Sequence, residues 1–274
     1  MVSDNAQDDN SQTNPQNLLN GQVCLITGAS RTLGAEIART LAHYGASVAI
    51  NYHQSEAAAE ALRDELAQAG HHAVIIQADV SQPDQVETLI KQTETELGPL
   101  EVVVNNVGPY VDEPFIQLSV AAFDEILAGN VRTTFLVSQV AGRLMKARGH
   151  GRIINIAATD AFHRSHSIYG LAKAGVIYLT EAMALELAPE VQVNAIAPDL
   201  IADNEGMKPA FVSQSVAGTP LGRLVTRSEV AEMVYRFCTP PFDIVTGQTL
   251  IMDGGRTLPR ISFGRGGTES AHSS

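Results

Sequence analysis

One tyrosine and one lysine in the second half of the chain have the spacing of an acid–base pair. Tyr169 and Lys173 are four positions apart, so on a helix they lie on one face, one turn from each other. A tyrosine with an ordinary pKa of about 10 is a weak proton donor at neutral pH, but a neighbouring ammonium favours the phenolate and lowers that pKa. Such a pair can protonate a carbonyl oxygen while a hydride adds to the carbon. The alternative is an ordinary helical contact beside a solvated lysine.

A glycine-rich turn near the start of the chain could hold a dinucleotide. The residues Thr27-Gly28-Ala29-Ser30-Arg31-Thr32-Leu33-Gly34 follow an apolar run and open a helical pattern. Glycines permit a tight turn and a close approach of backbone N–H groups to a pyrophosphate, whose charge the helix N-terminus favours. An ordinary turn between a strand and a helix is the alternative, so the assignment depends on the other motifs.

The end of the second apolar run indicates which dinucleotide would bind. An acid there usually holds a free ribose 2′-hydroxyl, whereas a 2′-phosphate requires that acid to be absent and a cation to be near. The chain has Asn51-Tyr52-His53-Gln54-Ser55 at this point, without an acid, and Arg31 lies in the glycine-rich turn. We therefore expect NADPH (NADP+) rather than NADH, with Arg31 and His53 as candidate phosphate contacts. A solvated surface position is the alternative for both side chains.

Short apolar runs rich in Val and Ile alternate with longer segments of helical period and would position these residues. Runs that are apolar on both faces are typical of strands in a parallel sheet covered by helices. We therefore expect an α/β fold of one domain: a doubly wound, parallel, seven-stranded sheet with helices on both faces, the Rossmann fold. The expected strands are 23–28, 47–52, 72–79, 100–106, 151–158, 191–198 and 248–255.

The two ends of the chain differ in composition from the body. Residues 1–20 are polar and predict a disordered arm, and residues 260–274 are rich in Gly and Ser and predict a flexible tail. The folded domain is then 21–259. Inside it, 199–226 carries Gly, Pro and Asn between a strand and a helix, which favours a mobile lid over a substrate or, alternatively, a poorly ordered surface loop.

Composition excludes several classes of function. Of 274 residues, 18 are basic and 30 acidic, and the formal net charge of −12 argues against non-specific binding to nucleic acid. No apolar run reaches the roughly 18 residues needed to cross a bilayer and no secretory signal is evident, so we expect a cytoplasmic protein without a membrane segment. The two cysteines, Cys24 and Cys238, cannot form a disulfide framework or a structural zinc site, and we expect no metal.

Taken together, these motifs resemble the short-chain dehydrogenase/reductase family, and the resemblance covers nearly the whole body. Besides the turn at 27–34 and YGLAK at 169–173, it rests on NNVG at 105–108, VNAIAP at 193–198 and VTGQTLIMDGG at 245–255. The chain is similar both to 3-oxoacyl-ACP reductase-like members and, at NYHQS and TLG, to pteridine reductase-like members.

The resemblance implies a role for each matching residue. Tyr169 would be the general acid and would also contact the cofactor. Lys173 would lower the Tyr169 pKa and bind the nicotinamide ribose, and Asn130 would hold a water in a proton relay to Lys173. Asp79 and Val80 would contact the adenine, although Asp79 could also cap a helix. The other expected cofactor-binding residues are Gly28, Ser30, Arg31, Thr32, Leu33, Gly34, Asn51, His53, Ser55, Asn106 and Gly108.

Three positions depart from the family pattern. Thr32 stands where a second glycine is usual, and its side chain would narrow the approach of the pyrophosphate. Asp199 replaces the glycine that usually follows the proline, which puts an acid near the nicotinamide unless it caps the lid segment. Ala158 occupies the place of the serine that binds the substrate carbonyl, and loss of such a donor can cost about 10²–10³ in rate.

Two neighbours of Ala158 could replace that serine. Thr159 could donate to the carbonyl oxygen, and Asp160 could act as an aspartate does in pteridine reductases, where it helps to protonate the substrate. A third possibility is that nothing replaces it. Ser165 and Ser167 lie closer to Tyr169 in sequence.

We therefore expect an NADPH-dependent reductase that transfers hydride to the carbonyl of a small-molecule ketone or aldehyde. A 3-oxoacyl thioester or a general ketone is favoured, and C=N reduction of a pteridine is the alternative. A catalytically weak dinucleotide-binding sensor is the alternative from another class: Ala158, Thr32 and Asp199 favour it, whereas the retained Tyr169 and its partners argue against it.

Two further expectations concern the surface of the protein. Apolar residues beyond one stripe at 119–148 and 166–188 predict a homo-oligomer, a dimer or a tetramer, although burial within one chain could explain the same pattern. The residues expected to wall the substrate pocket are Tyr110, Phe115, Phe162, His163 and those of 199–226.

Overall fold

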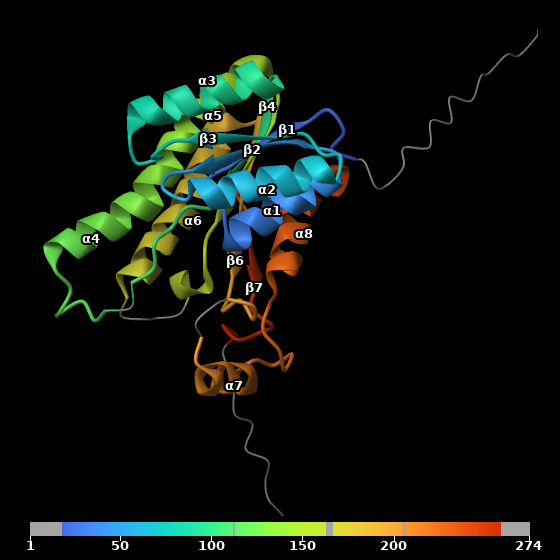
Figure 1. Cartoon of the computed structure of the whole chain (residues 1–274). Coiled ribbons are helices and arrows are strands. Elements are labelled where there is room, and N and C mark those ends of the chain that lie inside the picture. The colour runs from blue at the N-terminus through green and yellow to red at the C-terminus, as the bar shows by residue number, and fades with distance from the viewer. Residues whose placement is uncertain (1–17, 112, 163–166, 205–206, 259–274) are drawn as a thin grey trace, which may run out of the picture.

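The computed structural model describes residues 18–111, 113–162, 167–204 and 207–258. Within these ranges, seven parallel strands form one sheet in the order β3-β2-β1-β4-β5-β6-β7 (Figure 1). The strands are β1 (Val23–Ile26), β2 (Ser47–Tyr52), β3 (Ala73–Gln77), β4 (Leu100–Asn105), β5 (Gly151–Ile156), β6 (Val191–Pro198) and β7 (Thr249–Met252).

The strand order confirms the predicted doubly wound sheet. From β1 the chain moves outward to β2 and β3 on one side, then returns to pair β4 with β1 and continues outward on the other side. The order therefore reverses between β1 and β4. A ligand crevice is expected at the carboxyl ends of the strands at such a switch point.

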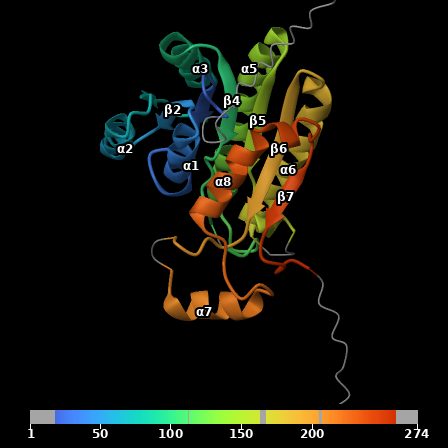
Figure 2. The ribbon, with the colours of Figure 1, turned by 90° about the vertical axis from the view of Figure 1, so that its right-hand side faces the viewer.

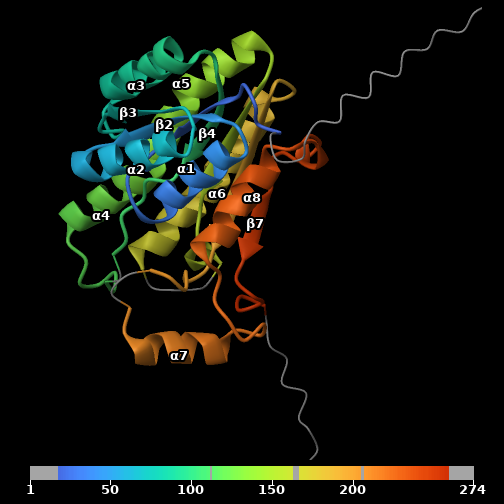
Figure 3. The ribbon, with the colours of Figure 1, turned by 45° about the vertical axis from the view of Figure 1, so that its right-hand side comes forward.

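Helices cover both faces of the sheet, as predicted. The apolar core on one face includes side chains of α1 (Thr32–His43), α2 (Glu56–Gln68) and α8 (Arg227–Phe237), which lie together in Figure 3. The core on the opposite face includes side chains of α3 (Pro83–Leu97), α5 (Thr133–Arg148) and α6 (Ile168–Leu187). Every residue of β1 is buried, because both of its faces are covered.

A π-helical turn joins two helices that the sequence pattern presents as one long segment. The chain passes from α4 (Val120–Leu127) through the turn Ala128–Arg132 into α5 without leaving helical conformation. π-Turns are rare, and they occur most often at functional sites. This one carries the fully buried Asn130.

The segment 199–226 is more regular than a loop. It contains α7 (Pro209–Gly218), which lies apart from the sheet in Figure 2. Its two ends pair with each other through a bridge between Ile201 and Val225. The Ala202 N–H donates to the Val225 carbonyl there, at 2.8 Å. The two ends of the segment 199–226 are therefore held together, and its motion as a lid over a substrate stays a prediction.

The folded body begins earlier than the sequence indicated. Leu19 is fully buried, and its N–H donates to the Tyr44 carbonyl at 3.0 Å. The prediction of disorder is therefore wrong for residues 18–20, because a single leucine among polar neighbours can still pack into the apolar core. Residues 1–17, residue 259 and the predicted tail 260–274 lie outside the described residues.

One helix of the described chain, α6, is long and apolar enough to cross a membrane, with a mean hydropathy of 1.2. The sequence analysis found no such run. Of the qualifying window, 44% is buried inside the protein, where α6 packs against β5, β6 and α5. A core helix of this kind passes the same length and hydropathy test as a membrane helix, so the finding is weak evidence for a membrane segment.

Thr32 adopts a left-handed backbone conformation with φ of 50°, and no other non-glycine residue of the described chain has a positive φ. This conformation costs a side-chain-bearing residue about 1–2 kcal/mol, and β-branching adds to the cost. A glycine would relieve the strain. It would also lower the free energy of unfolding by about 0.4–1 kcal/mol, because it gives the unfolded chain more conformational freedom. We expect Thr32→Gly to raise the free energy of unfolding by roughly 0.5–1 kcal/mol in urea titrations.

Thr32→Ala is the matched control for this prediction. It shortens the side chain but keeps the Cβ atom that makes a positive φ costly. Its free energy of unfolding should not rise as that of Thr32→Gly does. An equal gain from both variants would show that the strain does not come from the backbone conformation.

Candidate active site

The glycine-rich turn after β1 is packed too tightly for side chains. A Cβ atom on Gly34 would lie 2.6 Å from the Gly28 carbonyl oxygen and 2.7 Å from Nδ2 of Asn106. Gly28 has a φ of 60°, and a Cβ there would lie 2.9 Å from the Val107 side chain. Both predicted glycines are therefore required for the close contact between this turn and the one after β4.

Asn106 ties those two turns together. Its side-chain Nδ2 donates to the carbonyls of Thr27 and Gly28, at 3.1 and 3.2 Å. In return, the Thr27 hydroxyl accepts from the backbone N–H groups of Asn106 and Val107, at 3.0 and 3.3 Å. These four hydrogen bonds join the ends of β1 and β4, the two strands at the switch point.

The N-terminus of α1 points its backbone donors into this region without a side-chain cap. Arg31 is the N-cap residue, and its side chain makes no capping hydrogen bond. Uncapped N–H groups and the helix dipole make such a terminus suited to an anion. Ser30 is half-buried and Leu33 is buried, whereas Arg31 and Thr32 are exposed. Together with the glycine cradle, this terminus fits a dinucleotide pyrophosphate.

A cavity beside the glycine-rich turn brings together five predicted cofactor residues: Gly28, Asn51, His53, Asp79 and Val80. The sequence analysis missed its remaining lining residues, several of which belong to the end of α4 and the π-turn. For the residues of α4, the π-turn and the start of α5, the only signal in the sequence was their closeness to Asn130. These residues are Ala78, Ser81, Val107, Pro109, Glu125, Ala128, Gly129 and Thr133.

Asn51, an expected cofactor-binding residue, supports the glycine-rich turn from inside the fold. Its side chain is buried, its Oδ1 accepts from the Gly28 N–H at 3.1 Å, and its Nδ2 lies 3.1 Å from the Ala78 carbonyl, to which it donates. Asn51 therefore holds the glycine-rich turn in place. Arg31 and Ser55 are the N-cap residues of α1 and α2, and neither lines the cavity.

Asp79 keeps an ionised carboxylate in the cavity. Burial alone would raise the pKa of this carboxyl, but hydrogen bonds from Ser81 and the charge of His53 outweigh that effect and lower it. The Ser81 N–H lies 2.9 Å from Oδ1 of Asp79. An ionised carboxylate at this place can accept a hydrogen bond from an amino group such as that of adenine.

Tyr169 and Lys173 lie in the first two turns of α6, as their spacing predicted. The helix begins there because the Ser167 hydroxyl caps it, accepting from the Gly170 N–H at 3.2 Å. The Lys173 side chain is 3% exposed, and its Nζ donates to the Ile156 carbonyl at the end of β5, at 2.8 Å. That Nζ lies 5.4 Å from the centroid of the Tyr169 ring.

Asn130 reaches the same point from the π-turn. Its Nδ2 donates to the carbonyls of Pro109 and Ile126, both at 3.0 Å, while its buried Oδ1 has no hydrogen-bond partner among the described residues. A Cβ atom on Gly108 would lie 2.4 Å from that Oδ1 and 2.8 Å from Nζ of Lys173. The structure therefore brings Asn130, Lys173 and Gly108 together, and only a glycine fits between the two side chains.

Electrostatics at Tyr169 differ from the expectation. Burial raises the pKa of its hydroxyl, and the charge of Asp160 and the nearby Tyr110 raise it further. Burial also lowers the pKa of Lys173 to about 8, against an opposing contribution from Asp160. The pKa of Tyr169 is thus raised, whereas the sequence predicted that Lys173 would lower it. Burial, which the sequence does not display, is the reason.

Thr159 and Asp160 occupy different environments. Thr159 is fully buried, and its Oγ1 donates to Oδ1 of Asp199 at 2.7 Å. The hydroxyl proton of Thr159 is directed at Asp199 and so is not available to a substrate oxygen. In this arrangement Thr159 does not replace the donor that the family serine provides. Asp160 is half-buried and acts electrostatically on both Tyr169 and Lys173. Ala158 is buried.

One aromatic side chain lies close to Tyr169. The ring of Tyr110 meets that of Tyr169 edge-on, with centroids 5.0 Å apart and an interplanar angle of 74°. Tyr110, Phe115 and Phe162 are all exposed, which suits walls of an open pocket. The predicted wall residue His163, and also Ser165, lie outside the described residues.

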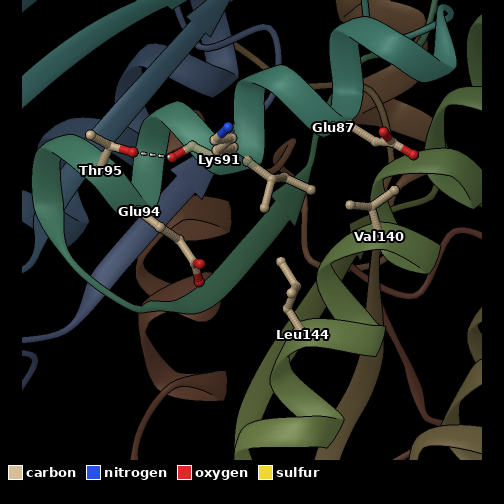
Figure 4. A pocket seen from close by; sticks show the side chains of 7 residues that line it. Glu87, Lys91, Glu94, Thr95, Val140 and Leu144 are labelled. Atoms are coloured by element: carbon tan, nitrogen blue, oxygen red, sulfur yellow. Dashed lines mark hydrogen bonds between the residues drawn. The ribbon is translucent and has the colours of Figure 1, made fainter.

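A second hollow of the described surface lies away from Tyr169 and Lys173. The groove in Figure 4 lies between α3 and α5, where the Thr95 hydroxyl donates to the Lys91 carbonyl at 2.8 Å. Its Glu94 accepts from Arg148, which also donates to the carbonyl of Leu100 at the start of β4. The groove is therefore at the amino ends of the strands, the edge opposite Tyr169. Among the described residues, no group of three acidic, histidine or cysteine side chains could hold a metal.

Comparisons with known proteins identify the family of the chain. The family described as "Enoyl-(Acyl carrier protein) reductase" matches residues 28–257. A 3-oxoacyl-[acyl-carrier-protein] reductase of Synechocystis sp. is 36% identical over 88% of this chain and 98% of its own length. A 3-oxoacyl-[acyl-carrier-protein] reductase of Staphylococcus aureus is 33% identical over 84% of this chain and 96% of its own length.

Solved structures agree as well. A dehydrogenase/reductase from Sinorhizobium meliloti has a TM-score of 0.81 and 33% identity, covering 87% of this chain and 96% of its own. A short-chain dehydrogenase/reductase from Serratia marcescens has a TM-score of 0.83 and 31% identity, covering 88% and 99%. On this family match, on relatives of this identity and coverage, and on the fold, the chain belongs to the short-chain dehydrogenase/reductase family of oxidoreductases.

Proposed function

We propose that the protein is an NADPH-dependent reductase that converts a ketone or aldehyde to an alcohol, with Tyr169 as the general acid. The observation that carries this proposal is the meeting of Tyr169, Lys173 and Asn130 at the switch point, with only Gly108 between the last two. The ketoreductase names of the relatives support a carbonyl as the substrate group. We expect this reaction in the cytoplasm.

The side chains would divide the work of proton transfer. Burial keeps the Tyr169 hydroxyl protonated at neutral pH, so that it can donate to a carbonyl oxygen. Lys173, with a pKa of about 8, is mostly charged at pH 7 and would stabilise the phenolate that remains after the proton has left. The unpartnered Oδ1 of Asn130 faces the same space and can orient a water on the route by which the proton is replaced.

Cofactor binding is assigned to groups already positioned in the chain. When bound, NADPH supplies the hydride. The uncapped N-terminus of α1 and the cradle of Gly28 and Gly34 would hold the pyrophosphate, and Arg31 would contact the 2′-phosphate. The ionised Asp79 would accept from the adenine amino group.

The substrate class is narrowed by the walls of the site. Tyr110, Phe115 and Phe162 present apolar surface, which suits an acyl chain or a ring next to the reacting carbonyl. We therefore place 3-oxoacyl thioesters and general ketones first. Asp160, which acts electrostatically on Tyr169, supports a pteridine as a second candidate, because an aspartate at this place helps to protonate the substrate in pteridine reductases.

Tyr169→Phe tests the proposed acid. Removing the hydroxyl should lower kcat by about 10²–10⁴-fold, since the proposed mechanism gives the protonation of the carbonyl oxygen to this group. The Phe ring keeps the packing, so NADPH binding should stay within about twofold. Consumption of NADPH is followed at about 340 nm against diketones, 3-oxoacyl thioesters, aldehydes and a dihydropteridine.

The outcomes of this assay separate the candidates. Turnover of a carbonyl that Tyr169→Phe abolishes supports the reductase, and the preferred substrate decides between ketone and pteridine. Unimpaired turnover in the variant would contradict the role of Tyr169. No turnover with any substrate by wild type, with NADPH still bound, would favour the dinucleotide sensor.

Arg31→Ala tests the choice of cofactor. A hydrogen bond to a charged phosphate contributes enough that its loss should weaken NADPH binding by about 10–100-fold. Binding of NADH, which lacks that phosphate, should not change. Arg63→Ala removes a comparable arginine from α2, where Arg63 pairs with Asp64, and should alter neither affinity. An equal loss for both dinucleotides in Arg31→Ala would exclude the 2′-phosphate contact.

We also propose that the protein forms a homo-oligomer through α5 and α6. Leu171, Tyr178 and Leu185 recur every seven residues, which is close to two helical turns, so they form one stripe along α6. All three are at least half exposed, and α5, which packs beside α6, exposes Phe135. A second copy of the chain would cover this apolar face.

Light scattering after size exclusion tests the oligomer. Wild type should have two or four times the 29.2 kDa mass of the chain, and Tyr178→Glu combined with Leu185→Glu should reduce it to 29.2 kDa, because two carboxylates cannot be buried unpaired in an interface. Ile244→Glu, at an exposed apolar residue outside the stripe, should keep the wild-type mass. A wild-type mass of one chain would contradict the proposal.

A further inference from the structure

Three side chains that follow three neighbouring strands are joined in one relay. Thr159 lies after β5, Asp199 directly after β6 and Arg256 after β7. The Thr159 hydroxyl donates to Oδ1 of Asp199 at 2.7 Å, and Nη1 of Arg256 lies 3.0 Å from Oδ2 of Asp199. Each carboxylate oxygen of Asp199 thus accepts from a different loop.

The carboxylate in the middle of the relay needs both donors. The side chain of Asp199 is 9% exposed, and a carboxylate so far from water is costly unless it is paired and hydrogen-bonded. Arg256, 28% exposed, supplies the opposite charge, and Thr159 supplies a short charge-assisted hydrogen bond. Removing Asp199 would leave a buried hydroxyl and a half-buried guanidinium without this partner.

The turn that carries Arg256 is itself fixed. Both carboxylate oxygens of Asp253 accept backbone N–H groups, from Gly255 at 2.8 Å and from Thr257 at 2.6 Å. The Asp199 N–H also donates to the Met252 carbonyl, at 3.1 Å. The guanidinium is therefore presented by a rigid turn that is connected to the backbone of Asp199.

The other end of the relay reaches the catalytic groups. Thr159 opens a short 3₁₀ turn, Thr159–Ala161, in which the Thr159 carbonyl accepts from the Phe162 N–H at 2.8 Å. That turn carries Asp160, whose charge acts on Tyr169 and Lys173. Only Ala157 and Ala158 separate this turn from Ile156, whose carbonyl accepts from Nζ of Lys173.

We propose that Asp199 and Arg256 are positioning residues that act through Thr159: together they hold the turn Thr159–Ala161, and with it Asp160, in a fixed place beside Tyr169 and Lys173. The departure from the family pattern at Asp199 then belongs to an arrangement in which an ion pair between two loops orients the turn Thr159–Ala161. The effect on turnover rests on the proposed reductase function, whereas the effect on the turn does not.

Turnover by variants of the relay is the first measurement. Asp199→Ala removes both acceptors and should lower kcat about 10-fold, with NADPH affinity within about twofold and KM little changed. Asp199→Asn keeps an oxygen acceptor for Thr159 but loses the charge that pairs with Arg256, and should lower kcat about fivefold, less than Asp199→Ala does. Thr159→Val should lower kcat about as much as Asp199→Ala, and the double variant should lower it no further, because both changes break the same contact.

A matched ion pair controls for a general loss of stability. Arg148 and Glu94 are each 26% exposed and lie 2.5 Å apart at the amino ends of the strands. Arg148→Gln should therefore disturb the fold about as much as Arg256→Gln. Only Arg256→Gln should lower kcat, by about 5–10-fold, and Arg256→Lys should restore part of the loss. Equal effects of the two glutamine variants on kcat would overturn the positioning role.

Hydrogen exchange of the amides of Ala161 and Phe162 gives a readout that needs no activity. Both amides bond within the turn, at 3.2 and 2.8 Å, and should exchange several-fold faster in Asp199→Ala and Arg256→Gln than in wild type or Arg148→Gln. Unchanged exchange would overturn the inference, whatever the activity. Faster exchange in a protein that reduces no carbonyl would support the relay while the proposed function fails.

Discussion

The hydrogen bond from the Lys173 ammonium to the carbonyl of Ile156 is the contact on which the site depends. A charge buried this deeply must have a partner, and the carbonyl at the end of β5 provides it. The bond fixes the distance between α6 and the sheet, and so the place of Tyr169 one turn earlier. It also brings Nζ so close to Gly108 that no side chain fits there. Strand end, helix start and glycine are thus three requirements of one interaction.

Apolar runs located the strands well because each strand is buried on both faces. The expected limits of β2 and β6 agree with the structure to the residue, whereas β1 ends two residues before its expected end, at the glycine-rich turn. What composition could not show was the helix α7 within 199–226 or the burial of Leu19. The burial of Leu19 depends on contacts with a segment distant in sequence, which local pattern does not encode. The helix α7 was missed because the Gly, Pro and Asn residues of 199–226 favour a loop.

For the site, spacing pointed to Tyr169 and Lys173, because helix geometry places residues four apart on one face, and the family resemblance pointed to Asn130. The partners of Asn51 and of Asp199 were beyond reach, since each contact joins loops whose conformations the sequence does not display. The pKa of Tyr169 moved opposite to the expectation for a related reason: burial acts on it, and burial is a property of the assembled fold. Motifs identified which residues meet, and packing decided what each one does.

Asn106 and Thr27 have a consequence for the way the sheet holds together as a whole. They join the first strand of one half of the sheet to the first strand of the other half, by hydrogen bonds from both backbone and side chain. The two halves of a doubly wound fold could otherwise open independently along the line between β1 and β4. Here that line is cross-linked at the ligand crevice itself, so the binding site and the cooperativity of unfolding share the same few bonds.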